Sequence, residues 1–548
     1  MKKHIQHILI LAFVCTTITS AQTPNWKWAR SAAGGEYDQS STITTDASGN
    51  VIIAGYFASD FITLGSITLQ NAGLGFDDVF IAKYDSSGNL LWAQSFGSIS
   101  DDKCTAVTTD NAGNIYLTGY FYSPTITIGT YTFTNAGNVG DIFIVKYDSN
   151  GNILWATKEG GPGLEIPHAI TVDALNNIVL VGRFSSNSIT FGTTTLALAG
   201  SMDVFVVKYD AAGNITWAQG EGGGSNDEAY AVKVDGLGNI YVAGYFNSNA
   251  LFGTITLSTT GISDAFIAKY DSSGTVLWAK KAGGSGDDRT NGLVIDEFGN
   301  SYVSGFFSND TIAFGSIQLL GTAVFNSFIA KYDAFGNEVW AKGIYGESKS
   351  FAITITPGNI YVCGFFREDS LVYGPSTLYL DGNTDFYLAN CDTAGNAGWA
   401  VQQTSGGPSS EIPNSIAADA WGNISISGYF DSDPIEFGPS VLRNTANGFD
   451  IFVARMGAMT TGISDPNDWN NIVLYPNPTS EIFILQSSLP INKIEIYNIT
   501  GENILTKTIS NNELRTEINI SSLPEGIYFV KAVGFSAQFC KKLIIQKN

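Results

Sequence analysis

An acidic column recurs through the chain at one fixed distance, eight residues before the aspartate of a short turn such as Asp46–Asn50. Crowded carboxylates either bind a cation or a basic ligand, or raise one another's pKa. They could instead accept backbone N–H bonds and tie neighbouring repeats together. The repetition favours this structural role, because catalytic sites usually break the symmetry of a repeat. As ligand-binding residues, the column could form a ring of carboxylates at one mouth of a central channel. Its members are Asp38, Asp102, Glu165, Asp227, Asp288, Glu347 (the nearest acid in a shortened repeat) and Glu411.

Residues that break the repeat symmetry are few. His168 is the only histidine after the first 21 residues, and Arg183 replaces a tyrosine common at its position. An isolated histidine can serve as a general acid or base, although a structural role is the commoner one. No nucleophile elbow, zinc-binding His-Glu-x-x-His, phosphate loop or dinucleotide fingerprint is present. We therefore assign no catalytic residue, no metal site and no cofactor. Cys363 and Cys391 fit either two buried thiols or a disulfide.

The composition excludes several classes of partner. The 548 residues carry 28 basic and 50 acidic side chains, a net charge of −22. Such acidity argues against nucleic acid and anionic membrane surfaces as partners. Residues 1–21 resemble a signal peptide, with two lysines, a short apolar run and a small-residue cleavage site. No segment reaches the ~18 apolar residues of a transmembrane helix. We expect an exported protein without a transmembrane segment.

One unit is repeated along most of the chain. The dipeptide Trp-Ala begins at residues 28, 92, 155, 217, 278, 340 and 399. Each unit has four short stretches rich in Val, Ile, Tyr and Phe, as in 229–235, 239–246, 264–271 and 275–281, which indicates strands. Asp-x-x-Gly-Asn joins the first stretch to the second and the third to the fourth. This is hairpin chemistry, because the Asp accepts N–H bonds within the turn and the Gly tolerates positive φ.

Four antiparallel strands repeated around an axis make a β-propeller. Seven first strands are predicted, but the last unit ends after its third strand, at 450–457. The segment "NWKWAR" (25–30) stands at the start without its own preceding strands. We therefore expect it to supply the missing fourth strand and to close a seven-bladed ring.

The repeats resemble the SBBP family of β-propeller repeats, through Trp-Ala, Gly-Gly, Asp and then Asp-x-x-Gly-Asn-x-Tyr-Val-x-Gly. The match covers about residues 24–457. This resemblance implies architecture and is nearly silent about function. The sixth repeat departs most, since "TITPGN" replaces the Asp turn and Cys391 replaces a tyrosine.

The tail differs from the repeats and closely resembles the type A C-terminal sorting domain of the type IX secretion system. The matching residues are Tyr475, Pro476, Asn477, Pro478, Gly526, Ile527, Tyr528, Lys541 and Lys542. The resemblance implies a small Ig-like β-sandwich, the type IX machinery as a partner, and release or attachment at the cell surface. The expected domains are a signal peptide (1–21), the propeller (22–457), a linker (458–471) and the sorting domain (472–548).

Two functions remain open from the sequence. The first is a non-enzymatic binding or adhesion module, with an extracellular glycan or protein as its ligand. Its expected surface is the face with the long connections between second and third strands. The second is a secreted carbohydrate-active lyase or hydrolase, with a pair of channel carboxylates or His168 in a central pocket. Near-uniform connections favour the binding module.

Overall fold

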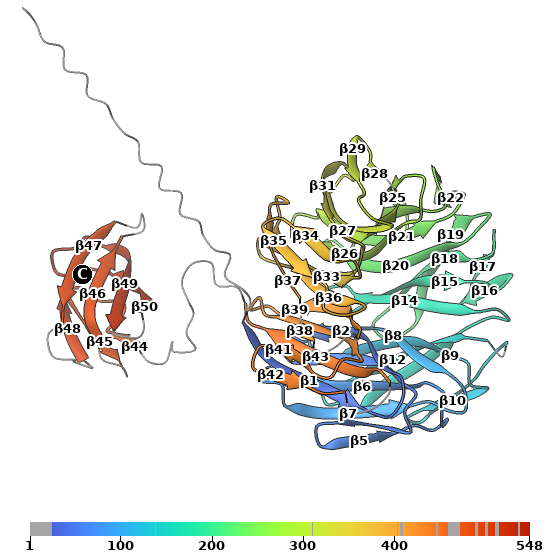
Figure 1. Ribbon diagram of the computed structural model, residues 1–548, viewed down its shortest axis with the longest axis horizontal. Coiled ribbons are helices and arrows are strands. Elements are labelled where there is room, and N and C mark those ends of the chain that lie inside the picture. Colours follow the sequence, from blue (N-terminus) through green and yellow to red (C-terminus); the bar gives the residue numbers. More distant parts are fainter. Residues whose placement is uncertain are drawn as a thin grey trace, which may run out of the picture. The chain divides into compact units, whose positions relative to one another are not determined.

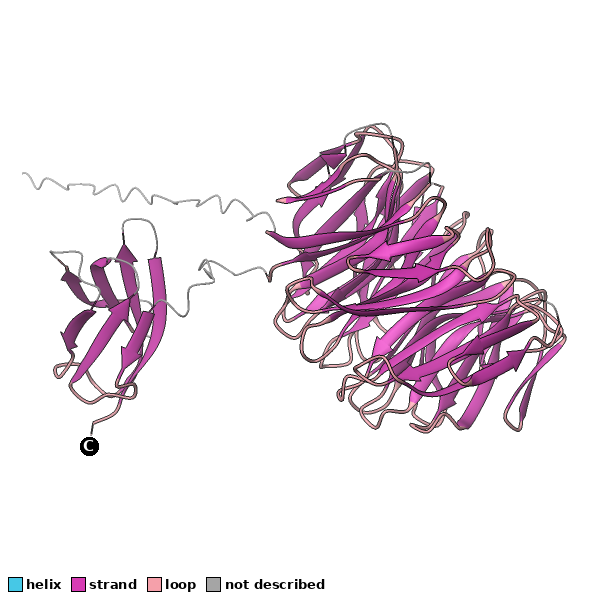
Figure 2. Cartoon of the chain, turned by 90° about the horizontal axis from the view of Figure 1, so that it is seen from below, coloured by secondary structure: helices cyan, strands magenta, loops and turns pink. Residues whose placement is uncertain are grey.

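The computed structural model describes residues 25–137, 139–309, 311–402, 404–405, 409–444, 448–458, 472–487, 491–498, 502–509, 515–534 and 538–547. These residues form strands and turns, with no helix among them (Figure 2). Within these ranges, no helix has the length and apolar character that crossing a membrane requires. The predicted signal peptide and all but the first residue of the predicted linker lie outside the described residues. The chain divides into two compact units, Met1–Met459 and Thr460–Asn548.

The first unit is built from sets of four antiparallel strands that pair in chain order. The first strands are β2 (Asp38–Thr45), β8 (Asp102–Thr109), β14 (Glu165–Val172), β20 (Asp227–Val234), β26 (Asp288–Ile295), β32 (Ser348–Thr356) and β39 (Glu411–Ala418). The second strands are β3 (Val51–Phe57), β9 (Ile115–Phe121), β15 (Ile178–Phe184), β21 (Ile240–Phe246), β27 (Ser301–Ser308), β33 (Asn359–Phe366) and β40 (Ile424–Phe430).

The third strands are β6 (Asp78–Tyr84), β12 (Asp141–Tyr147), β18 (Asp203–Tyr209), β24 (Asp264–Tyr270), β30 (Phe325–Tyr332), β36 (Asp385–Asp392) and β43 (Asp450–Met456). The fourth strands are β7 (Leu90–Phe96), β13 (Ile153–Glu159), β19 (Ile215–Gly223), β25 (Val276–Gly283), β31 (Glu338–Ile344), β37 (Ala397–Gln402) and β1 (Trp26–Ala33).

The turns between these strands have the predicted chemistry. In the turn after β2, Asp46 Oδ1 accepts the N–H groups of Ser48 and Asn50 at 2.9 and 3.0 Å, and the Asn50 side chain donates to Asp46 Oδ2 at 2.8 Å. Gly49 between them has φ +73°, which a β-branched residue would not adopt. The turn sequence therefore fixes each hairpin locally.

The first strands form a closed sequence of contacts. β2 contacts β8, β8 contacts β14, and the contacts continue through β20, β26 and β32 to β39, which contacts β2 again. Figure 1 shows the sheets arranged around a common centre in this propeller-like manner. The hydrophobic core lies between neighbouring sheets, as where Val181 and Val204 pack in one cluster with Phe246 and Phe266.

The N-terminal strand β1 pairs antiparallel with β43, which is the pairing that the sequence predicts. Trp28 on β1 is buried, and its indole N–H donates to the carbonyl of Ser86 at 3.1 Å. Other fourth-strand tryptophans make the same bond to the following repeat, for example Trp92 to Ser149 and Trp217 to Ser272. The first segment of the chain thus joins the last set of strands to the first.

The connections between second and third strands fold into small hairpins. Some of them pair with the fourth strand of the preceding set, as in β1–β4, β19–β22 and β25–β28. The hairpins are β4 (Phe61–Leu64) with β5 (Ile67–Gln70), β10 (Thr125–Ile128) with β11 (Tyr131–Thr134), β16 (Ser188–Phe191) with β17 (Thr194–Ala197), β22 (Asn249–Phe252) with β23 (Ile255–Ser258), β28 (Thr311–Phe314) with β29 (Ile317–Leu320), β34 (Ser370–Tyr373) with β35 (Ser376–Tyr379), and β41 (Ile435–Phe437) with β42 (Ser440–Leu442). The two-residue strand β38 (Thr404–Ser405) pairs with β41.

Every first strand carries a β-bulge at the same place, where one residue has no partner on the second strand. In β2 the register steps from Ser40 to Thr42 while β3 advances by one residue. The unpaired residues are Ser41, Thr105, His168, Tyr230, Asn291, Phe351 and Asn414. We call these the bulge residues.

The second unit consists of two antiparallel sheets. One contains β44 (Ile472–Tyr475), β45 (Ile482–Ser487) and β48 (Arg515–Asn519), and the other contains β47 (Asn503–Thr508), β46 (Ile491–Tyr497), β49 (Gly526–Gly534) and β50 (Gln538–Ile545), in these orders. Their apolar side chains form one core that includes Phe483, Ile496 and Leu543.

Candidate binding cavity at the centre of the ring

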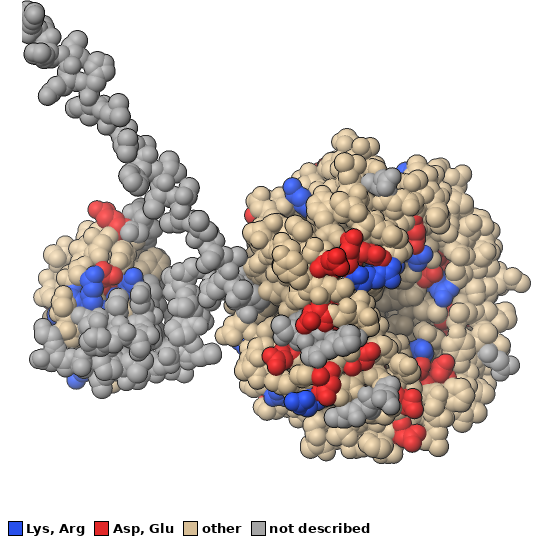
Figure 3. Space-filling view, viewed as in Figure 1, with Lys and Arg blue, Asp and Glu red and all other residues tan. Residues whose placement is uncertain are grey.

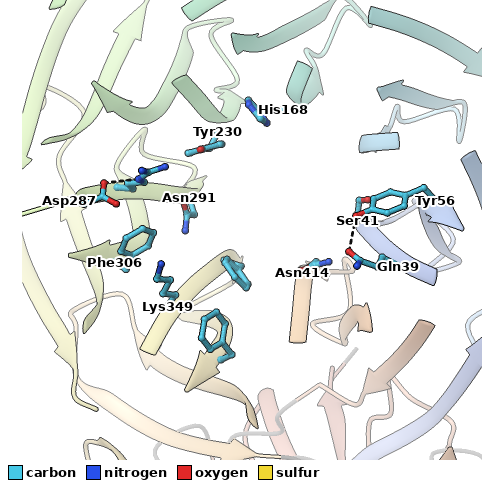
Figure 4. Close-up of a pocket in the computed structure, with 13 residues that line it drawn as sticks. Gln39, Ser41, Tyr56, His168, Tyr230, Asp287, Asn291, Phe306, Lys349 and Asn414 are labelled. Atoms are coloured by element: carbon cyan, nitrogen blue, oxygen red, sulfur yellow. Dashed lines mark hydrogen bonds and ion pairs between the residues drawn. The ribbon is translucent and has the colours of Figure 1, made fainter. Parts of the chain in front are cut away.

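A cavity of about 620 Å³ opens at the centre of the first unit. This volume lies within the range of about 300–1,000 Å³ that is typical of small-molecule sites. Figure 3 shows the hollow, with Lys, Arg, Asp and Glu side chains gathered at its rim. Its lining residues are Gln39, Ser41, Tyr56, His168, Tyr230, Asp287, Arg289, Asn291, Phe306, Lys349, Phe351, Phe365 and Asn414 (Figure 4).

The bulges supply much of this lining. A bulge inserts one residue and re-aims its side chain, and such irregularities are common next to functional sites. Every bulge residue except Thr105 lines the cavity. The remaining lining comes mostly from the start of the first strands and the second-strand residues opposite them, as with Gln39 and Tyr56. The bulge therefore converts a regular inner strand into a source of cavity side chains.

Several lining polar groups are held by hydrogen bonds. The Tyr56 hydroxyl donates to Gln39 Oε1 at 2.8 Å. The side-chain amides of Asn291 and Asn414 donate to the backbone carbonyls of Ser350 and Ser40 on the next first strand, at 2.8 and 2.9 Å. These side chains are therefore fixed before any ligand arrives.

His168 lies in the wall, as the alternative enzymatic hypothesis requires. Its Nε2 is 3.1 Å from Glu228 Oε2, and Arg183 Nε is 3.3 Å from the same oxygen. Tyr245 donates to the other Glu228 oxygen at 2.7 Å. Burial alone would raise the pKa of Glu228, but His168, Arg183 and Tyr245 together lower it to about 2. Glu228 is therefore an ionised partner of two cationic or basic groups.

Two cationic side chains occupy another part of the wall. Arg289 Nε pairs with Asp287 at 2.7 Å, and its guanidinium lies 4.1 Å from the centre of the Tyr245 ring. The ammonium of Lys349 lies 3.7 and 4.3 Å from the ring centres of Phe325 and Phe306. Burial lowers the pKa of Lys349, and Arg289 and Arg367 add to this effect against the opposing charges of Asp287 and Glu347.

The acidic column lies elsewhere. Six of its side chains are fully buried at the junctions between sheets, and none lines the cavity. Asp227 is typical: it accepts the N–H groups of Gly223 and Asn247 at 2.6 and 3.0 Å, and its own N–H donates to Met202 of the preceding sheet at 2.9 Å. The buried members are Asp38, Asp102, Glu165, Asp227, Asp288 and Glu411. A ring of ligand-binding carboxylates at the channel mouth is therefore not what the structure contains.

The placement of Glu347 in the column is wrong by one residue. Ser348, the first residue of β32, pairs with Phe366 as Asp38 pairs with Phe57. Glu347 is partly exposed instead and forms an ion pair with Arg367. The shortened sixth repeat has a serine in the column, so the nearest acid in sequence was misleading.

A second set of buried acids at the start of the third strands faces the column. Asp203 accepts the N–H of Ala199 at 2.6 Å, and its charge adds to the burial that raises the pKa of Asp227 to about 7. Burial likewise raises the pKa of Asp102 and Asp288 to about 7. Among the described residues, no group of three or more His, Cys, Asp or Glu side chains is placed to hold a metal ion.

Cys363 and Cys391 are buried free thiols. Cys363 pairs with Leu388 and Cys391 pairs with Ile360, so the two cysteines are out of register on neighbouring strands. This settles the open choice in favour of thiols.

The predicted sorting residues connect the two ends of the second unit. Asn477 Oδ1 accepts the N–H of Ile544 at 2.8 Å, and the neighbouring Thr479 bonds to Ile544 and Gln546. Tyr475 donates to Gln486 at 3.1 Å, and Tyr528 donates to the carbonyl of Pro524 at 3.0 Å. Pro476 and Pro478 flank Asn477, Gly526 begins β49, and Lys541 and Lys542 lie on β50.

The sequence did not predict the bulge residues as a site, although it singled out His168. The signal that could have found them is the difference in residue type between repeats. The column itself is nearly uniform, whereas the position three residues later carries Ser, Thr, His, Tyr, Asn, Phe and Asn in the successive repeats. The expected recognition face, formed by the long connections, consists largely of the small hairpins that extend the sheets.

Comparison with known proteins identifies the tail and supports the repeat architecture. Residues 473–546 match the secretion system C-terminal sorting domain. An uncharacterized WD repeat-containing protein of Acanthamoeba polyphaga mimivirus is 25% identical over 532 residues, covering 77% of this chain and 38% of that protein. The regulatory protein FlaEY of Caulobacter vibrioides is 22% identical, covering 72% of this chain and 44% of that protein.

The chain thus spans about two-fifths of the length of these relatives. Among solved structures, YCF48 bound to D1 peptide matches with a TM-score of 0.36 and 9% identity, over 81% of this chain and 99% of that chain. The protein is an all-β, propeller-like repeat protein with a C-terminal secretion sorting domain.

Proposed function

We propose that this protein is an exported, non-enzymatic binding module: a seven-bladed β-propeller, closed by β1, whose central cavity binds an extracellular glycan or protein. The observation that carries the proposal is the contrast between two positions of the same strand. Junction positions are nearly uniform among the repeats and buried, whereas the bulge positions differ in chemistry and line one cavity. Structural needs account for the uniform positions, and selection for a ligand accounts for the varied ones.

The closed succession of first-strand contacts and the β1–β43 pairing support seven blades. A ring built in this way leaves no open sheet edge between its first and last strands. It also holds the bulge residues on rigid strands, which is a better support for recognition than mobile loops.

The sorting domain supports export through the type IX system, to the extracellular space or the cell surface. We propose domain limits of 22–457 for the propeller and 472–548 for an Ig-like sorting domain, with residues 458–471 as a linker.

The experiment is a binding screen on glycan arrays and extracellular protein extracts, with wild type and an Asn414→Trp variant. The indole would fill part of the cavity, so we expect the variant to lose the ligand. It should remain folded, with a melting temperature lowered only by the loss of the Asn414–Ser40 hydrogen bond. A matched control, Thr63→Trp, places the same ring on the partly exposed outer strand β4 and should bind normally. Equal binding by all three proteins would contradict a cavity site.

A carbohydrate-active enzyme is the second candidate, because His168 lines the cavity and pairs with the buried Glu228. An activity screen on surface polysaccharides tests it. Turnover that is lost in His168→Gln would favour the enzyme, whereas binding without turnover favours the module.

A further inference from the structure

The distribution of charge in the cavity wall points to a ligand class. Lys103 and Lys349 occupy the same position of their strands, one residue after the column, and each ammonium lies over an aromatic ring of the preceding sheet. Lys103 lies 4.5 Å from the centre of the Tyr56 ring and also pairs with Asp77 at 2.8 Å. It is therefore neutralised within the protein.

Lys349 lacks the equivalent carboxylate. The residue equivalent to Asp77 in the fifth sheet is Phe325. Each directly precedes the residue that pairs with the last phenylalanine of the second strand: Asp78 pairs with Phe57, and Asn326 pairs with Phe307. A phenylalanine ring thus stands where the other junction has an aspartate. No carboxylate among the described residues forms an ion pair with Lys349.

The neighbouring acids are already engaged. Asp287 pairs with Arg289, and Glu347 pairs with Arg367. Lys349 lies on the cavity wall between these two pairs in sequence. Burial lowers its pKa, Asp287 and Glu347 oppose that shift, and Arg289 and Arg367 add to it, so the two acids attract Lys349 from a distance without bonding to it. A half-buried ammonium without an ionic partner is costly, and an anion delivered by a ligand would offset that cost. The whole chain carries a net charge of −22, so a cavity cation without a bonded carboxylate is a local exception that favours an anionic ligand.

We propose that the cavity binds an acidic saccharide, whose carboxylate pairs with the Lys349 ammonium beside Arg289. This inference rests on the proposed binding function of the cavity. Aromatic rings of Tyr230, Phe351 and Phe365 offer apolar faces for the C–H faces of sugar rings. The amides of Gln39, Asn291 and Asn414 supply polar groups for sugar hydroxyls in the same lining (Figure 4).

An acidic peptide fits less well. The carboxylate of Asp287 lines the cavity and that of Glu228 lies behind His168, so a run of peptide carboxylates would meet like charges beyond the first contact. A saccharide presents one carboxylate per ring, with neutral hydroxyls between successive charges.

The test is a calorimetric titration of the full chain with trigalacturonate and with its uncharged methyl ester, which has the same sugar backbone. Lys349→Met removes the charge and keeps an unbranched side chain beside Phe306 and Phe325. We expect trigalacturonate to bind more tightly than the ester. Because a hydrogen-bonded ion pair contributes about 1.5–3 kcal/mol, Lys349→Met should weaken its binding about tenfold or more. Lys103→Met, the matched control, should change binding less than about twofold.

Four results would overturn the inference. Equal binding of acid and ester, or equal binding by wild type and Lys349→Met, would remove the role of the charge. Tighter binding of a pentaglutamate peptide that depends on Lys349 would assign the site to acidic peptides. If neither saccharide binds, acidic saccharides are excluded as the ligand class. The Asn414→Trp comparison judges the cavity independently, so the broader proposal can stand when this one fails.

Discussion

Asp203 and Asp227 bring two buried carboxylates together where one sheet meets the next. Asp203 Oδ2 accepts an N–H of its own sheet, and its Oδ1 is buried without a hydrogen-bond partner. Gly222 lies against both groups: a Cβ there would be 2.9 Å from Asp203 and 2.7 Å from Asp227, and its φ is +151°. A side chain at Gly222 would therefore push the pair apart. In the fifth sheet the position equivalent to Asp203 is the uncharged Asn326, whose side-chain oxygen accepts the N–H of Thr322 at 2.9 Å.

Replacing Asp203 by Asn should stabilise the propeller at pH 8. The amide oxygen can accept the Ala199 N–H, as Asn326 does, and the amide nitrogen can donate to Asp227. The substitution also removes one of two repelling charges. We expect a higher melting temperature at pH 8 and a smaller change at pH 5, where Asp227 is mostly protonated. The control Asp433→Asn removes an exposed charge, and an equal rise there would contradict the local explanation.

Wild-type stability should fall as the pH rises from about 4 to 7. Burial raises the folded-state pKa of Asp38 and Asp78 to about 6 and of Asp450 to about 7, above the value of 3.8 for a free aspartate. The folded state then binds more protons than the unfolded state in this window, so each unit of pH lowers the free energy of unfolding.

The turn aspartates act in the opposite direction and in another window. Hydrogen bonds to Asn152 and Asn214 lower the pKa of Asp148 and Asp210, so their contribution is lost only below about pH 4. Thermal unfolding across pH 3–9 should show a maximum near pH 4–5. A melting temperature that increases steadily to pH 8 would disprove the assignment of buried, raised-pKa carboxylates.

At the scale of the strand, β1 carries the closure of the ring. Deleting residues 22–33 should leave β43 with an open edge and remove the Trp28 packing, whose loss alone typically costs about 3–5 kcal/mol. We expect a lower melting temperature and concentration-dependent association, measured by calorimetry and by size-exclusion chromatography with light scattering. A monomer with unchanged melting would show that β1 is dispensable.

The strands themselves were predictable because their signals are local. Asp-x-x-Gly-Asn specifies each hairpin within five residues, and the missing last Trp-Ala strand identified the partner of β1. A bulge shifts the phase of a period-two pattern by one residue. It was not predictable here because the first strands, such as the mostly polar β2, hold too few apolar residues to show that shift. His168 was therefore recognised as unusual, but Ser41 and Asn414 were not.

The burial of the acidic column could not be predicted from the sequence either. Asp203 and Asp227 are on different sheets, and their meeting depends on how the sheets pack rather than on either strand. The repetition favoured a structural role, and the backbone N–H bonds that Asp227 accepts fit that role. The expected position at the channel mouth was wrong, because six side chains of the column are buried at junctions between sheets and do not line the cavity.

At the scale of the whole molecule, the two units have separate cores and the tail has its own sheets. Truncation at residue 459 should therefore leave a folded propeller with native melting, which accumulates in the cell envelope instead of the medium. Circular dichroism of the purified fragment and immunoblots of cell fractions measure the two effects. Normal delivery of the truncated protein would contradict the sorting role.

Fold and export were readable from the sequence because both depend on repeated or extended motifs. The central cavity was not readable, because it is assembled from single residues contributed by separate repeats, and only the closed ring brings them together.

The most direct test of a central binding site is a crystal structure of the full chain with the ligand that the binding screen selects. The account predicts difference density in the cavity, in contact with bulge residues such as Tyr230 and Asn414. Ligand density found only on the outer hairpins, from β4–β5 through to β41–β42, would contradict a central binding site if the cavity stayed empty at full ligand saturation.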